Sequence, residues 1–257
     1  MSYPVALLLL IVIAVPFGGQ VGTPAVVWGL LSGVAQAFGV WWFYAALGSG
    51  PISVVSPLTA ILVAGIPVGV GLALGERPGP IALVGVLLAL VAVALVSREA
   101  VDEPIARRAS SADEDPKPHK FTPKVAWLTI GSGVAFGMNF VILDQVPVEA
   151  ELWPLVFGRL AATAIVMVAA IFTANLVFER GVPLQLAVFA GILDTVANVA
   201  TLVALQSSML SLAGVLIALY PAATVLLAIA VLRERVTPWQ AIGMVLALAS
   251  VGMIAAG

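Results

Sequence analysis

Residues 75–90 have the sequence GERPGPIALVGVLLAL, in which a charged dipeptide and two prolines precede an unbroken apolar run. A similar stretch, RERVTPWQAIGMVLAL, occupies residues 233–248. Sliding the chain on itself by 158 residues aligns a glutamate, a proline and a glycine of the two stretches: Glu76 with Glu234, Pro80 with Pro238, and Gly85 with Gly243. A match at one fixed offset indicates an internal repeat, so we expect two related halves.

The composition around this repeat is that of an integral membrane protein. Of 257 residues, 62% are apolar and 9% are charged, whereas a soluble domain has about 25% charged residues. The chain has no cysteine and a single histidine, His119, which excludes thiolate or zinc sites and predicts no metal. The net charge of −2 gives no reason to expect a nucleic-acid partner.

Short polar breaks divide the chain into nine apolar runs. All but the first are long enough to cross a hydrocarbon core of about 30 Å as helices, and the first is about half-length. The runs are about twice as long as barrel strands and do not alternate in polarity. We therefore predict an all-α membrane protein, a polytopic helical bundle with its spans at 4–17, 24–47, 51–74, 80–97, 124–143, 152–175, 183–205, 209–232 and 238–256.

Half of the charges, together with four prolines, lie between Arg98 and Lys124. This stretch is typical of a solvated connector, and it predicts a first repeat at 1–97, a connector at 98–123 and a second repeat at 124–257. An odd number of spans per repeat turns the second copy upside down, which is a transporter architecture with its site near the bilayer midplane. The excess of Lys and Arg on the connector side predicts a cytoplasmic connector.

Two such halves resemble the EamA-type transporters of the drug/metabolite transporter superfamily. The residues that carry the resemblance are Tyr44-Ala45-Ala46-Leu47, Gly75-Glu76, Pro80 and Gly85 in the first half, and Phe136-Gly137-Met138-Asn139-Phe140, Arg159, Glu234, Pro238 and Gly243 in the second. The resemblance implies ten helices, of which the first has no counterpart here, a central cavity, no cofactor and no enzymatic activity. It also implies export of a small metabolite, an amino acid or a drug-like compound through the inner or plasma membrane. The alternative is a non-transporting or degenerate paralogue, or a partner subunit.

Two formal charges, Arg159 and Asp194, lie inside apolar runs. A charge at the centre of a membrane helix costs about 2.5–3.5 kcal/mol even on the lenient insertion scale, so such residues are candidates for function. The two lie at similar depths in antiparallel spans, so we expect them to be able to pair. Three roles are open: a structural ion pair, substrate contact by Asp194, or proton coupling at Asp194.

Other polar and aromatic side chains share helix faces with Asp194 or with its aligned position. Asn198 and Thr201 follow Asp194 at i+4 and i+7, and Gln36 aligns with Asp194 in the repeat. We therefore expect a cavity lined by Gln36, Trp41, Tyr44, Asn139, Asp194, Asn198, Thr201 and Tyr220. The alternatives are hydrogen bonds between helices, which average about 0.6 kcal/mol, and lipid-facing aromatic side chains.

Proline and glycine positions predict how the spans bend and pack. Tyr220-Pro221 lies in the middle of a span, where proline bends a helix, and Pro57 and Pro67 are expected to act likewise. Small residues four apart indicate close helix packing. They occur at Gly65, Gly69, Gly71 and Gly75, at Gly85 with Ala89, and at Gly243 with Ala247.

Overall fold

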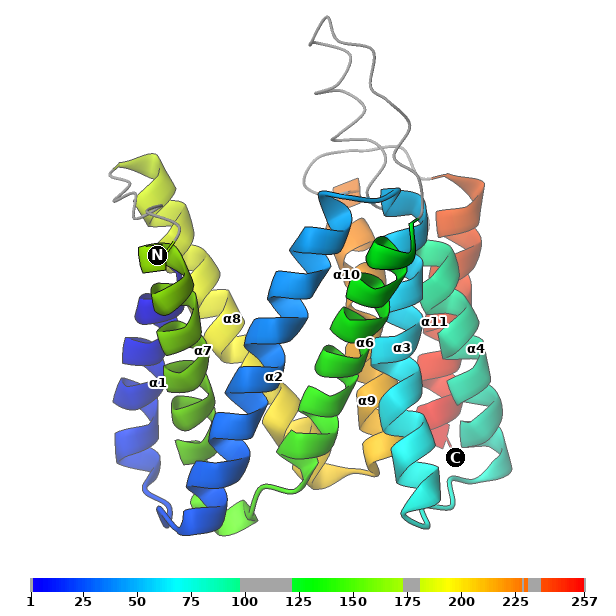
Figure 1. The fold of residues 1–257 in the computed structure, drawn as a ribbon. Helices are drawn as coiled ribbons and strands as arrows, with labels where there is room; N and C mark the ends of the chain where they lie inside the picture. Colours follow the sequence, from blue (N-terminus) through cyan, green and yellow to red (C-terminus); the bar gives the residue numbers. More distant parts are fainter. Residues whose placement is uncertain (1, 98–121, 173–180, 228, 231–236, 257) are drawn as a thin grey trace, which may run out of the picture. The chain divides into compact units, whose positions relative to one another are not determined.

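A computed structural model describes residues 2–97, 122–172, 181–227, 229–230 and 237–256. The described part of the chain is helical throughout and contains no strand (Figure 1). Its elements are α1 (Ser2–Phe17), α2 (Thr23–Leu47), α3 (Ile52–Ala73), α4 (Pro80–Ser97), α6 (Pro123–Asp144), the 3-10 turn η1 (Val148–Ala150), α7 (Trp153–Phe172), α8 (Val182–Ser207), α9 (Leu210–Ala218), α10 (Tyr220–Leu227) and α11 (Pro238–Ala256).

The predicted helical bundle is confirmed. Within the described residues, seven helical stretches are long and apolar enough to cross a membrane, and α1 and α7 provide two shorter apolar helices. Helices α9 and α10 form one stretch that is interrupted at Leu219. The interruption lies beside Pro221, which has no backbone donor and whose ring crowds the carbonyl four residues earlier. Helix α3, in contrast, continues through Pro57 and Pro67.

The chain forms two compact units that differ from the two sequence repeats. Unit 1 comprises Met1–Phe38 and Met138–Ser208, and unit 2 comprises Gly39–Gly137 and Met209–Gly257. Each unit therefore takes segments from both repeats, and helices α2 and α6 contribute to both units. The repeat boundaries stay a prediction. The predicted connector falls, apart from its last two residues, outside the described residues, as does Glu234.

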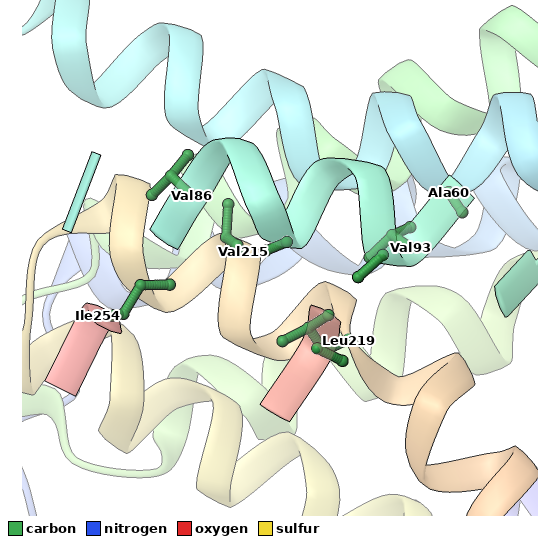
Figure 2. Packing of buried hydrophobic residues seen from close by; sticks show 9 residues of the cluster. Ala60, Val86, Val93, Val215, Leu219 and Ile254 are labelled. Atoms are coloured by element: carbon green, nitrogen blue, oxygen red, sulfur yellow. The ribbon is translucent and has the colours of Figure 1, made fainter. Parts of the chain in front are cut away.

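Unit 2 is organised around an apolar cluster from α3, α4, α9 and α11. Figure 2 shows how Val86 and Val93 of α4 lie with Val215 and Leu219 and with Ile254 of α11. All of these side chains are more than nine-tenths buried. Between membrane helices, van der Waals packing of such side chains is a main source of attraction.

Helices α4 and α11 pack against one another with reciprocal contacts at two glycines. A Cβ added to Gly85 would lie 2.9 Å from Cγ1 of Ile254, and a Cβ added to Gly243 would lie 2.6 Å from Cγ2 of Val96. Gly85 and Gly243 are 158 positions apart, as are Val96 and Ile254. Exchanged partners of this kind are what a two-fold axis between two copies produces. The sequence repeat therefore has a structural counterpart in this helix pair, and close packing at these glycines is confirmed.

The turn after α3 reaches the start of α9 through Glu76. Its Oε1 accepts a hydrogen bond from the Leu210 amide at 2.6 Å, and its Oε2 accepts one from the Ser211 amide at 2.9 Å. These amides belong to the first turn of α9, where donors lack partners within the helix and a negative charge is favourable. Gly75 turns the chain at φ 98°, and a side chain at Gly71 would collide with the Glu76 carboxylate. Both glycines are therefore required by this cap.

The remaining glycines of α3 do not mediate close packing. Among the described residues, no atom lies within 4 Å of a Cβ added at Gly65 or Gly69, so the prediction of close helix packing there is wrong. The glycine that makes room is instead on the neighbouring helix. Pro67 of α3 sits against Gly214 of α9, where an added Cβ would meet its ring. The ring of Pro67 on α3 thus occupies the space left by the missing side chain of Gly214 on α9.

Unit 1 contains α1, the first part of α2, the end of α6, α7 and α8. Helix α1 packs against α7 and α8, and Figure 1 shows it beside α7. At one end of the unit, the loop after α1 is bonded to the segment before α7. The indole N–H of Trp153 donates to the Gly18 carbonyl at 2.9 Å, and the Gln20 amide donates to the Glu149 carbonyl at 2.8 Å.

Candidate functional site

The structure brings the two intramembrane charges together in an ion pair within unit 1. Nη2 of Arg159, on α7, donates to Oδ2 of Asp194, on α8. The two side chains differ in exposure: Arg159 is 5% exposed, whereas Asp194 is 40% exposed. The guanidinium therefore lies inside the unit, and the carboxylate is the accessible member of the pair.

The buried Arg159 follows a close contact between α7 and α2 at glycines. A Cβ added to Gly33 would collide with the backbone of Gly158, and one added to Gly29 would lie 3.0 Å from Cβ of Phe157. The residue after Gly158 is Arg159, which is 5% exposed. This contact was not predicted, although Gly29 and Gly33 show the same spacing of four as the small-residue pairs named above.

Asn198 completes a group of three polar side chains. One turn along α8 from Asp194, its Nδ2 donates to the Asp194 carbonyl at 2.7 Å and to Oδ1 at 3.2 Å. The two carboxylate oxygens thus have different partners, Arg159 on Oδ2 and Asn198 on Oδ1. This arrangement fixes the orientation of the Asp194 side chain while leaving part of it exposed.

Nearby hydroxyl groups bond to their own helices. Oγ1 of Thr163 donates to the Arg159 carbonyl at 2.7 Å, and Oγ1 of Thr195 donates to the Gly191 carbonyl at 2.8 Å. Such bonds to the preceding turn satisfy a hydroxyl group without needing another helix. The polar character of the site therefore comes mainly from Arg159, Asp194 and Asn198.

Three further predicted residues lie in unit 1. Gln36 and Thr201 are half-buried, and Asn139 is buried. Within the described residues, Oδ1 of Asn139 has no hydrogen-bond partner. A buried acceptor without a donor costs about 1–3 kcal/mol, so this oxygen has the capacity to accept a hydrogen bond from a solute.

The aromatic residues of the predicted cavity belong to unit 2. Trp41, Tyr44 and Tyr220 are 55%, 68% and 57% exposed. Tyr44 has its ring 6.0 Å from that of Phe43 in an edge-to-face arrangement. Since these residues and Asp194 lie in different units, their meeting around one cavity stays a prediction.

A pocket in unit 1 lies away from these residues. It has a volume of about 230 Å³ and is formed by the loops before α2 and α7, where its lining includes Gln20, Pro147 and Glu149. None of the predicted site residues lines it. No group of His, Asp or Glu side chains in the described ranges is arranged to hold a metal ion.

The group around Asp194 presents hydrogen-bond acceptors to a solute. The exposed side of the pair is a carboxylate, whose two oxygens offer about four acceptor positions. The cation of the pair is buried behind it. The arrangement thus suits a polar solute that brings N–H or O–H donors, within helices that are otherwise apolar.

Comparison with known proteins identifies the family. A model described as the EamA-like transporter family matches residues 123–256, slightly more than half of the chain. A solved structure titled "Crystal structure of protein" has the same fold, with a TM-score of 0.72 and 20% sequence identity over 98% of this chain and 84% of the other. The search of curated proteins finds no significant match. The chain therefore belongs to the EamA-like transporter family and is a multi-pass membrane transporter, not an enzyme.

Proposed function

We propose that this protein exports a small metabolite, an amino acid or a drug-like compound, across the cell membrane by alternating access. Membership of the family supports transport. The observation that carries the position of the site is the partly exposed Asp194 carboxylate, held by Arg159 within apolar helices. Charged residues in membrane helices are expensive and mark solute or ion pathways.

The proposed solute site centres on one face of α8. Asp194 and Asn198 supply fixed polar contacts, and Thr201 continues the same face one turn further. Gln36 and Asn139 add amide groups from the same unit, and the unpartnered Oδ1 of Asn139 gains a hydrogen bond when a donor arrives. Trp41, Tyr44 and Tyr220 are proposed as apolar contacts for the solute.

Proton coupling at Asp194 stays a prediction that the ion pair opposes. Protonating Asp194 removes the negative charge that compensates Arg159, and the guanidinium is 5% exposed. An uncompensated buried charge is strongly unfavourable. Neutralising Asp194 during a transport cycle would therefore cost Arg159 its ion pair with α8.

Counterflow in proteoliposomes tests this function. The full chain is reconstituted, loaded with one solute from a panel of amino acids, drug-like amines, and neutral and anionic metabolites, and supplied with the same solute in labelled form outside. We expect saturable exchange for at least one member, strongly reduced in Asp194→Asn. Glu149→Gln is the matched control, because it makes the same chemical change at an exposed loop carboxylate.

The absence of exchange would contradict the proposed transport. If no member exchanges although the protein is folded and inserted, the alternative of a non-transporting paralogue or partner subunit is favoured. Imposing a pH gradient separates coupling from exchange. Gradient-driven accumulation that disappears in Asp194→Asn, while exchange persists, would establish Asp194 as the coupling residue.

A further inference from the structure

We propose that Asp194 binds an ammonium group, so that the substrates are amines, as cations or as zwitterions. This inference rests on the proposed function, since it assigns the substrate class of that same site. It follows from which member of the ion pair is exposed, which acceptors remain on it and where the other cations of the chain lie.

The exposed carboxylate retains unused acceptor positions. Arg159 occupies one position on Oδ2, and Asn198 occupies one on Oδ1. A carboxylate has about four lone-pair positions, so about two remain. The side chain is 40% exposed, and we assign this exposed part to the remaining positions, where a solute would bind. An ammonium group brings three donors and a positive charge, and hydrogen bonds between charged groups are about twice as strong as neutral ones.

An anionic substrate would find no equivalent partner at this site. Of the basic side chains in the described ranges, Arg77 lies in a loop, Lys124 lies in the first turn of α6, and Arg159 is the one in a helix interior. Arg159 is 5% exposed and is already paired with Asp194. A carboxylate or phosphate would first have to displace Asp194 and approach its negative charge. The arrangement therefore selects against anions.

Arg159 acts here as a positioning residue and also limits affinity. Its charge nearly cancels that of Asp194 at long range, so an ammonium group is recognised by direct contact and not by distant attraction. Removing the guanidinium leaves Asp194 with an unpaired negative charge inside an apolar helix, which is costly and which a bound ammonium group would offset. A site that binds ammonium should then bind it more tightly, whereas a merely structural pair would only lose stability.

The experiment uses two matched sets of probes that differ only in the charged group. The aromatic set is phenethylamine, 2-phenylethanol and 3-phenylpropionate, and the aliphatic set is butylamine, butanol and pentanoate. Binding of each labelled probe to the full chain in detergent is measured by equilibrium dialysis. We expect at least one amine to bind about tenfold more tightly than its alcohol or carboxylate counterpart.

Three variants separate recognition from folding. Arg159→Gln should strengthen amine binding by about threefold, the size of an exposed charge effect. Asp194→Asn should abolish the preference for the amine. Because that change strands Arg159, the double variant Arg159→Gln with Asp194→Asn provides a folded protein without either charge, and it should also lack the preference. Glu149→Gln should behave as the parent chain does.

Two outcomes would overturn the proposal. The first is a set in which the carboxylates bind as tightly as the amines, or in which no amine binds at all. The second is an undiminished amine preference in the folded double variant. Counterflow distinguishes this failure from that of the proposed function: exchange of anionic or neutral solutes alone leaves a transporter with a different substrate class, whereas no exchange of any solute contradicts transport itself.

Discussion

Two helix contacts, one in each unit, both depend on glycines that allow close approach, but they differ in the residues that lie beside them. In unit 2, Gly85 and Gly243 bring α4 and α11 together beside a cluster of apolar side chains. In unit 1, Gly33 and Gly158 bring α2 and α7 into backbone contact, and the adjacent residue is the buried Arg159. The first contact lies beside apolar side chains, whereas the second lies beside a buried charged side chain.

The difference indicates how a chain with few charges builds a polar site. Close approach at glycine excludes lipid and solvent from the contact, whatever residue comes next. Where the neighbours are valine and isoleucine, the gain is packing, and the reciprocal contacts of α4 and α11 make a scaffold. Where the neighbour is arginine, the charge must be compensated: Asp194 pairs with Arg159, and Asn198 donates a hydrogen bond to Asp194.

The largest effect is expected at the contact of unit 1. In Gly33→Ala, the new Cβ would lie within 2.8 Å of the Gly158 Cα, and both sides of this clash are backbone. We expect a loss of about 3 kcal/mol in unfolding free energy, or no recoverable folded protein. Denaturant titration in detergent measures this. Gly65→Ala is the control, because its Cβ meets nothing within 4 Å, and equal losses in the two variants would contradict the contact.

The ion pair should give the next largest effect. Asp194→Asn leaves the buried guanidinium without its counter-charge, and we expect about 2 kcal/mol of destabilisation, less than for a fully buried pair because Asp194 is 40% exposed. Adding Arg159→Gln removes the stranded charge and should restore most of the stability. Thermal unfolding of the single and double variants checks this. A double variant that is less stable than Asp194→Asn would show that the two changes do not compensate.

The α4–α11 contact should respond more mildly, because its clash involves a side chain. In Gly243→Ala, the new Cβ would lie 2.6 Å from Cγ2 of Val96, and we expect a loss of about 1 kcal/mol. Combining it with Val96→Ala moves the small residue across the interface and should recover part of this loss, which a double-mutant cycle measures. Gly252→Ala, on the same helix and in open space, is the control. Strict additivity would argue against direct contact.

The smallest effect is expected at the cap of α9. Glu76→Gln removes the charge and one of the two acceptors that bind the Leu210 and Ser211 amides. We expect a local loss of about 1 kcal/mol, seen as faster hydrogen exchange of these two amides with little change elsewhere. Glu149→Gln should leave them unchanged. Unaltered exchange in Glu76→Gln would mean that the cap does not hold the helix.

Several structural features were predictable because their signals are local. The run at 80–97 is helix α4, Pro80–Ser97, with its start marked by proline, and the span around Tyr220-Pro221 is interrupted beside that proline. Arg159 and Asp194 were conspicuous because charges are rare in such helices. The cap by Glu76 was not foreseen, since nothing in the turn sequence shows which helix start it will reach.

The sequence alone determined that this chain crosses a membrane many times, that it contains a repeat at an offset of 158 residues, and that it resembles the family to which it belongs. These features can be predicted because the hydropathy of a span is a sum over consecutive residues, and a repeat is found by comparing the sequence with itself. Only the tertiary structure decided that Asp194 is the exposed member of its pair, which glycines are in contact, and that Glu76 caps α9. Those facts depend on how helices far apart in sequence are rotated and packed, and in a membrane many rotations bury apolar surface about equally well.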